Sequence, residues 1–239
     1  KASPEVVRIV DKVMTEDYGN PSSMHRKGIE AEKYIRDARR KIASVLKVQE
    51  NEIYFTSGGT EANNWAIIGS ALANKRAGGR ILTTAMEHPA VSEPLKFLEG
   101  QGFEVTEIPV DSSGQLDMAR LSEELTPDVI LVTMMYVNNE IGAVTPVREI
   151  AGLVHGKCPQ ALYHVDAIQA FGKYRINPKA EGIDLLSVSG HKLHGPKGTG
   201  FLYASRKARL LPLIYGGGQQ DGMRSGTENV PGIAGLGVA

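Results

Sequence analysis

Residues 189–200 read SGHKLHGPKGTG, and this stretch decides the fold. It lies between two apolar segments, 184–188 and 200–204, each of which is typical of a short buried strand. The glycine-rich turn therefore places Lys192 at the end of a strand, where α/β proteins build their ligand sites. A lysine in a loop is usually a solvated cation, but the neighbours of Lys192 favour a candidate covalent anchor for a cofactor.

Two histidines, His191 and His194, lie close to Lys192 in the sequence. A lysine attacks a carbonyl carbon only as the free amine, so a reactive lysine needs burial or nearby cations. The two imidazoles suit such a site, and the glycines around them allow the backbone to approach closely. The sequence therefore predicts a setting for Lys192 that supplies burial or positive charge.

The composition indicates a globular chain with one sizeable core. The 239 residues are 41% hydrophobic and 23% charged, and 27 basic residues balance 27 acidic ones. This balance gives no indication of a nucleic-acid or membrane partner held by bulk electrostatics. The sequence shows neither a bilayer-spanning apolar run nor a signal-peptide pattern, and its single cysteine, Cys158, excludes an internal disulfide framework. We expect a cytoplasmic location and no metal site.

Strand-like and helix-like segments alternate without repeats, which predicts an α/β fold with a mainly parallel central sheet flanked by helices. Ser22 or Ser23 is the expected cap of the first long helix. The expected helices span residues 22–46, 60–75, 89–99, 118–124 and 147–155, and the expected strands span 52–55, 80–84, 103–108, 129–133, 161–165, 184–188 and 200–204.

Residues 57–61, SGGTE, lie between an expected strand and an expected helix. Backbone N–H groups at Gly59 and the Thr60 hydroxyl would face outward at a helix N-terminus, which predicts a phosphate site. An ordinary turn with Thr60 as helix cap remains the alternative. Dinucleotide and P-loop sites are disfavoured, because the Gly-x-Gly-x-x-Gly spacing and the Walker lysine are both missing.

Residues 164–169, HVDAIQ, put Asp166 at the end of an apolar strand, with one further strand before Lys192. A carboxylate there can pair with a cationic group of a bound ligand. Two unit charges 4 Å apart attract by about 4 kcal/mol at an effective dielectric constant of 20. A helix cap is the alternative role for Asp166, and the two roles are compatible.

Two other motifs follow expected strands. In EHPAV, residues 87–91, His88 comes just before a helix opened by Pro89, and its imidazole could stack on a flat ring and exchange protons. In VNNEIG, residues 137–142, Asn139 is a candidate polar contact. Taken alone, His88 reads as a capping or loop residue and Asn139 as a turn former.

Together these motifs resemble those of the class V, fold-type I pyridoxal-phosphate enzymes, and among them the NifS/IscS-like cysteine desulfurases. The resemblance runs from GNPSS at residues 19–23 to GTEN at residues 226–229. It implies the large, pyridoxal 5'-phosphate-binding domain of a fold-type I transferase. In many related aminotransferases an aromatic residue takes the place of the ring-covering histidine, so His88 favours the desulfurases.

The resemblance also implies a role for each matching residue. Lys192 would form the Schiff base with the cofactor, and His88 would cover the ring as an acid–base group. Asp166 would face the ring nitrogen, while Asn139 and Gln169 would contact the phenolic oxygen. The phosphate contacts would be Gly59, Thr60, Ser189, His191 and, from the partner subunit of a homodimer, Thr227.

The implied reaction converts L-cysteine to L-alanine and passes the sulfur to an enzyme cysteine as a persulfide. Sulfur-acceptor or scaffold proteins would take it onward to iron–sulfur cluster assembly or other sulfur-transfer pathways. In the family, the nucleophilic cysteine and an arginine that binds the substrate carboxylate lie beyond the segment matching residues 224–227, and neither is found in this chain. Cys158 matches no motif of the family.

The chain is therefore expected to be a fragment. Residues 1–15 would be an N-terminal helix left from the small domain, residues 16–239 the large domain, and the C-terminal small domain would be absent. Three alternatives stay open: a selenocysteine lyase, a class V aminotransferase, and a non-catalytic module that binds the cofactor or dimerises.

Overall fold

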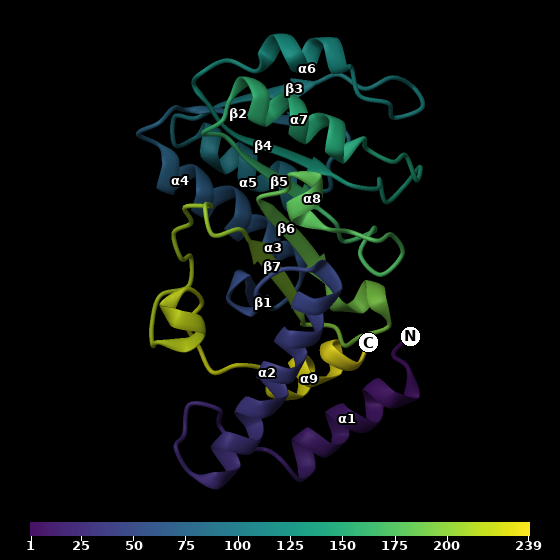
Figure 1. Ribbon diagram of the computed structural model, residues 1–239, viewed down its shortest axis with the longest axis vertical. Helices are drawn as coiled ribbons and strands as arrows, with labels where there is room; N and C mark the ends of the chain where they lie inside the picture. Colours follow the sequence, from purple (N-terminus) through teal and green to yellow (C-terminus); the bar gives the residue numbers. More distant parts are fainter.

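The computed structural model describes residues 1–239, in which one seven-stranded sheet runs through the molecule in the order β1-β7-β6-β5-β4-β2-β3 (Figure 1). Strands β2 to β6 are parallel, and β7 is antiparallel to both of its neighbours, β6 and β1. This confirms the mainly parallel α/β sheet. The strands are β1 Ile53–Thr56, β2 Arg80–Thr84, β3 Glu104–Ile108, β4 Val129–Met135, β5 Leu162–Asp166, β6 Leu185–Ser189 and β7 Gly200–Ala204.

Helices cover both faces of the sheet. Helices α3, α4 and α5 pack on one face, and α2, α6, α7 and α9 contribute to the core of the other. Helices α1 and α2 both pack against α9, at the bottom of Figure 1. The helices are α1 Pro4–Thr15, α2 Arg26–Leu46, α3 Gly59–Asn64, α4 Ser70–Asn74, α5 Pro89–Glu99, α6 Met118–Glu124, α7 Val147–Lys157, α8 Pro178–Glu181 and α9 Val230–Val238.

The start of α2 differs from the expected one. Its N-cap is His25, whose Nδ1 atom accepts a hydrogen bond from the Gly28 N–H. Ser22 and Ser23 instead belong to a turn closed by Asn20, which accepts from both of their backbone N–H groups. The prediction of a serine cap was therefore wrong, because these serines serve the preceding turn.

The segment expected as one helix over residues 60–75 is helical from residue 59 to 74 but contains a π-helical turn, Trp65–Gly69, between α3 and α4. This turn meets the segment that follows β7. The Trp65 indole N–H donates to the Leu211 carbonyl at 2.9 Å, and the Gly69 carbonyl accepts from the Leu211 N–H. Helices α8 and α9 were not predicted.

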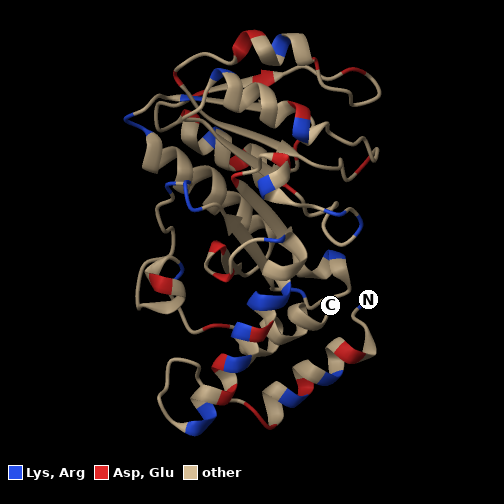
Figure 2. Ribbon diagram, in the orientation of Figure 1, with Lys and Arg blue, Asp and Glu red and all other residues tan.

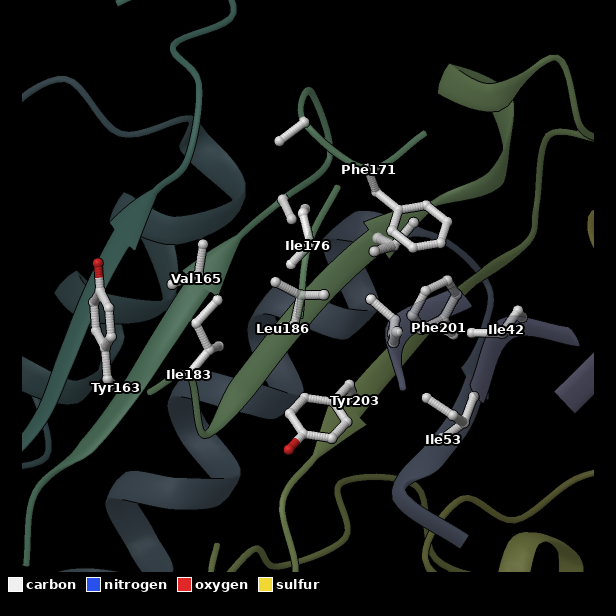
Figure 3. Packing of buried hydrophobic residues seen from close by; sticks show 14 of the residues in the cluster. Ile42, Ile53, Tyr163, Val165, Phe171, Ile176, Ile183, Leu186, Phe201 and Tyr203 are labelled. Atoms are coloured by element: carbon white, nitrogen blue, oxygen red, sulfur yellow. The ribbon is translucent and has the colours of Figure 1, made fainter. Parts of the chain in front are cut away.

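The larger core lies between the sheet and α2, α7 and α9. Figure 3 shows how side chains of β1, β5, β6 and β7 stand on this face beside Ile42 of α2. Phe171 and Phe201 meet edge to face, with ring centroids 5.2 Å apart. Such aromatic pairs contribute about 0.5–1.5 kcal/mol beyond the burial of their area.

Charged residues of both signs are interspersed over the outer helices and loops (Figure 2). No helix in the structure combines the length and the apolar character needed to cross a membrane. The division of the chain into a small-domain remnant and a large domain stays a prediction.

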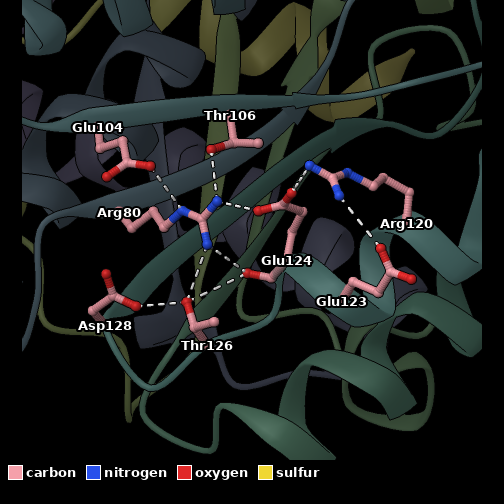
Figure 4. Close-up of polar contacts among 8 residues, drawn as sticks. All are labelled: Arg80, Glu104, Thr106, Arg120, Glu123, Glu124, Thr126 and Asp128. Atoms are coloured by element: carbon pink, nitrogen blue, oxygen red, sulfur yellow. Dashed lines mark hydrogen bonds and ion pairs between the residues drawn. The ribbon is translucent and has the colours of Figure 1, made fainter.

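At the start of β2, a polar network around Arg80 connects this strand with β3 and with the end of α6 (Figure 4). The Arg80 guanidinium pairs with the Glu124 carboxylate and, at 3.2 Å, with Glu104, and it donates to the hydroxyl groups of Thr106 and Thr126. The Arg80 and Glu124 side chains are only 14% and 9% exposed. Glu124 also pairs with Arg120, whose side chain is half exposed, so Arg80 is the better buried of its two cations.

We therefore expect Arg80→Ala to lower the free energy of unfolding by about 2 kcal/mol, because it removes charged hydrogen bonds and leaves the nearly buried Glu124 carboxylate with only the half-exposed Arg120 as its cation. Arg8, whose ion pair with Glu5 is exposed, supplies the control, and Arg8→Ala should change stability by less than about 1 kcal/mol. Urea denaturation of the two variants measures both effects. Equal losses would contradict a special role for the Arg80 network.

Candidate active site

Five of the strands that end at one edge of the sheet lead into the candidate site. Strands β2, β4, β5 and β6 are parallel, and β1 points the same way because it pairs antiparallel with β7. The segments that follow these five strands enclose a cavity of about 180 Å³. Its lining residues are Gly59, Thr60, His88, Ala90, Met135, Val137, Asn139, Asp166, Ile168, Gln169, Ser189, His191 and Lys192.

Nine of the ten predicted site residues line this cavity, and Thr227 is the exception. Thr227 borders a different hollow, beside Asp17 and Gly19. Its absence from the cavity of its own chain is compatible with a role in a partner subunit, and that role stays a prediction.

One corner of the cavity is built from the turn between β1 and α3. Gly58 is the N-cap of α3 and has a φ of 148°, which favours glycine. A Cβ atom on Gly59 would lie 2.1 Å from the Ile168 side chain, so the turn packs closely against the residues after β5. Thr60 is in the first helical turn and is not the cap. Gly59 and Thr60 line this corner, and the N–H groups of a first helical turn have no partner within the helix.

The opposite side of this corner comes from the end of β6. The Ser189 hydroxyl and the His191 Nδ1 atom are 2.9 Å apart. Partial burial lowers the pKa of His191, and the charges of Lys192 and Lys197 lower it further. Hydroxyl, imidazole and helix N–H groups together form a set of donors that suits a phosphate group.

Asp166, the last residue of β5, presents a buried carboxylate to the cavity. Its Oδ1 atom accepts from the Ile168 N–H at 2.9 Å, and its Oδ2 atom accepts from the Asn63 amide at 2.7 Å. Burial raises the pKa of Asp166, while these two hydrogen bonds lower it. Neither partner is a cation, so a protonated ring nitrogen would be a favourable neighbour for this carboxylate.

Asn63 was missed by the sequence analysis. It is fully buried on α3 and connects this helix to the carboxylate at the end of β5. The signal in the sequence was weak, because an asparagine within a helix has no characteristic spacing from the aspartate it contacts 103 residues later.

A second missed feature is a chain of polar side chains across three central strands. The His164 ring lies 2.7 Å from the Thr133 hydroxyl through Nδ1 and 2.9 Å from the Ser187 hydroxyl through Nε2. All three residues are buried, and burial lowers the pKa of His164 to about 3. The imidazole is therefore neutral, and it joins β4, β5 and β6 directly behind Asp166.

His88 caps α5, as the sequence allowed. Its Nδ1 atom accepts from the Ala90 N–H at 3.0 Å, which assigns the proton of the neutral ring to Nε2. His88 also borders the cavity. The nitrogen that remains for chemistry is Nε2, in the role of a donor.

Lys192 lines the cavity from a short 3₁₀ turn, Gly190–Leu193, that follows β6. Its side chain is exposed, so of the two expected settings, burial or nearby positive charge, this chain does not supply burial. The turn lies at the rim of the sheet edge, where the cavity opens to solvent. His194 does not contribute to the site, because its ring turns toward the Lys1 carbonyl, 3.1 Å away.

The glycine-rich loop after β7 is held against α3. Arg224 binds both carboxylate oxygens of Glu61, at 2.9 and 3.1 Å, and Glu61 also accepts from the Ser57 N–H. Arg224 is thus an ion-paired residue and not a solvated surface charge. The pair fixes the loop beside the candidate phosphate corner.

A model of the aminotransferase class-V family matches residues 1–239. The chain belongs to the class-V aminotransferase family. It is 48% identical over 235 residues to the cysteine desulfurase IscS of Methanosarcina thermophila, covering 98% of this chain and 58% of that protein. The chain spans about three fifths of the length of the curated relatives it matches.

Solved structures share the fold. A NifS-like protein superposes with a TM-score of 0.97 at 41% identity, covering all of this chain and 65% of the other. The structure of SspA in complex with cysteine gives a TM-score of 0.93 at 38% identity and covers 99% of this chain and 68% of that one. These matches confirm the predicted family and the fold-type I architecture.

We expect Asn63→Leu to raise the pKa of Asp166 by about one to two units, since it removes a hydrogen bond worth about 1.5–3 kcal/mol to the charged form. Carbon-13 NMR titration of the Asp166 carboxyl group measures this shift. Asn64→Leu is the matched control, because the Asn64 amide bonds only the Thr60 carbonyl of its own helix. A similar titration in all three proteins would contradict the role of Asn63.

Proposed function

We propose that this chain forms the pyridoxal-phosphate-binding part of a cysteine desulfurase. The observation that carries the proposal is the convergence of Lys192, Asp166 and His88 with the start of α3 at one cavity. Relatives that bear the name cysteine desulfurase support the reaction class, and the cysteine complex of SspA supports L-cysteine as substrate.

The residues present fit the cofactor. The buried carboxylate of Asp166, held by neutral donors only, suits a protonated ring nitrogen. The donors at the start of α3 and the end of β6 suit the phosphate, and Asn139 and Gln169, which line the same cavity, would contact the phenolic oxygen. When bound, pyridoxal phosphate supplies an aldehyde for covalent attachment and a conjugated ring that accepts electrons from the substrate α-carbon.

The side chains of this chain then have separate tasks. Lys192 Nζ anchors the cofactor and moves protons at the substrate α-carbon. His88 would lie over the ring and could donate a proton from Nε2, since its Nδ1 atom accepts from the Ala90 N–H. Asp166 holds the charge of the ring nitrogen, and Asn63 keeps the Asp166 carboxylate in position.

The sulfur requires a thiol that this cavity does not contain. The reaction takes L-cysteine and an enzyme thiol to L-alanine and a persulfide, so that one C–S bond breaks, one S–S bond forms and no external oxidant is needed. Cys158 is buried at the end of α7, before β5 begins, and therefore at the opposite edge of the sheet. Burial raises the pKa of its thiol, which disfavours the nucleophilic thiolate.

We assign the acceptor thiol to another part of the protein. In this proposal the persulfide sulfur passes to acceptor or scaffold proteins, for iron–sulfur cluster assembly or another sulfur-transfer pathway. A homodimer would place Thr227 at the cofactor phosphate of the partner. The cytoplasmic location also stays a prediction.

The test uses the full-length protein that contains this chain, loaded with pyridoxal phosphate. L-cysteine should yield alanine and persulfide sulfur in equal amounts, and Lys192→Ala should lower the rate at least about 100-fold because the proton carrier is lost. Borohydride reduction and peptide mapping should find the cofactor on Lys192. Lys197→Ala, at an exposed lysine nearby, is the control.

Two outcomes would redirect the assignment. Turnover of L-selenocysteine without L-cysteine would indicate a lyase for selenium, and amino transfer to a keto acid would indicate an aminotransferase. Failure of the protein to take up the cofactor would contradict the proposal altogether.

A further inference from the structure

Glu87 lies directly before His88 in the turn between β2 and α5 and has no task in the proposed reaction. Its Oε1 atom accepts two hydrogen bonds, from the Thr84 hydroxyl at 2.7 Å and from the Met135 N–H at 3.0 Å. Thr84 is the last residue of β2 and Met135 the last of β4, and these strands are neighbours. One carboxyl oxygen therefore ties the turn that carries His88 to two strand ends.

The geometry points to Glu87 as a positioning residue for His88, holding the β2–α5 turn against the end of β4. His88 and Met135 both line the cavity. The backbone N–H group that donates to Glu87 is that of Met135, so Glu87 is bonded to a residue that lines the same cavity as the His88 imidazole. The Ala90 N–H fixes the ring from the α5 side, and Glu87 fixes the turn from the sheet side. This inference depends on the proposed function only in taking His88 as a working residue.

The protonation state of Glu87 follows from its surroundings. Its Oε2 atom is buried and has no hydrogen-bond partner. Burial, with a smaller contribution from the Asp166 carboxylate, raises the pKa of Glu87 to about 8 against the effect of the two donors. The titratable groups of β5 that face it, Asp166 and Tyr163, supply no positive charge, and no lysine or arginine pairs with it. At neutral pH the group is therefore a carboxylic acid.

A neutral acid suits this position for two reasons. Its Oε1 atom is then a carbonyl oxygen that accepts from Thr84 and Met135 without placing a second anion beside Asp166. Ionisation would put a buried negative charge on Glu87 with no cation to offset it, which is costly. Above about pH 8 we therefore expect the turn to shift and the His88 ring to lose its fixed position.

The raised pKa of Glu87 makes the stability of the fold depend on pH. Unfolding releases the Glu87 proton at every pH between the ordinary value of 4.5 and about 8, so stability falls as pH rises through this window. The unfolding equilibrium constant should increase by up to about tenfold per pH unit through this one group. Other groups titrate as well, so the quantity to measure is the difference between the wild-type protein and Glu87→Gln.

The decisive experiment follows the His88 ring by nitrogen NMR in the full-length protein, labelled on histidine, before the cofactor is added. In the wild type the His88 signals should shift with an inflection near pH 8. Glu87→Gln keeps the oxygen acceptor but cannot ionise, so the inflection should vanish while the signals at neutral pH are retained. Glu99→Gln, at the exposed end of α5, is the matched control and should keep the inflection.

Kinetics provide the second readout. In the loaded protein, Glu87→Ala should lower kcat for L-cysteine by about 10- to 100-fold, as expected for a displaced catalytic group, and change KM much less. Glu87→Gln should stay close to the wild type at neutral pH, which a charge-dependent role would not allow. If Glu87→Ala does not fold, the nitrogen NMR comparison of the wild type with Glu87→Gln still tests the positioning role.

The outcomes separate this inference from the proposed function. His88 signals that titrate identically in the wild type and in Glu87→Gln would overturn the positioning role, whatever the enzyme does. A protein that shows the inflection near pH 8 but does not desulfurate cysteine would support the positioning role and contradict the proposed function.

Discussion

The buried Asp166 carboxylate is the group on which the rest of the site depends. Taking a carboxylate out of water costs several kcal/mol, and only hydrogen bonds and an opposite charge can offset this. Here the Ile168 N–H and the Asn63 amide supply the hydrogen bonds. The opposite charge would come from a ligand. This arrangement joins α3 to the end of β5 and leaves the carboxylate in need of a cationic partner in the cavity.

On the face of the sheet that carries Asp166, the three central strands β4, β5 and β6 are apolar in their first halves and polar in their second halves. On the face covered by α3 and α5, each has a buried leucine in its first half, Leu131, Leu162 or Leu185, which belongs to the smaller apolar cluster. Two residues further on, the same face presents hydroxyl or imidazole groups joined in one hydrogen-bonded chain. The apolar half anchors the helices, and the polar half supports the site. A fully apolar face would pack equally well but would leave Asp166 in a much less polar environment.

Local signals in the sequence predicted most of the elements, and long-range contacts account for what was missed. The bounds of β2 and α5 were predicted correctly, because β2 is rich in the β-branched residues typical of a strand and Pro89 marks the first residue of α5. Lys192, Asp166 and His88 each follow or end an expected parallel strand, so the sequence predicted that they lie at one edge of the sheet, and all three line the cavity. Asn63 could not be found this way, because its importance comes from a partner that only tertiary folding brings near. The exposure of Lys192 depends likewise on what covers the rim of the cavity, which no local pattern encodes.

The edge strand β1, which leads into the candidate phosphate corner, is hydrogen-bonded on both of its sides. On one side β1 pairs with β7, and Gly200 permits the close approach, since a Cβ atom there would lie 2.9 Å from the Gly58 backbone. On the open side the Gln220 amide takes the place of a further strand: its oxygen accepts from the Phe55 N–H at 2.6 Å and its nitrogen donates to the Phe55 carbonyl at 2.8 Å. An edge strand closed in this way is protected from pairing with another chain. The same loop carries Arg224, so one segment both seals β1 and holds α3, and the turn between β1 and α3 is left with little freedom to move.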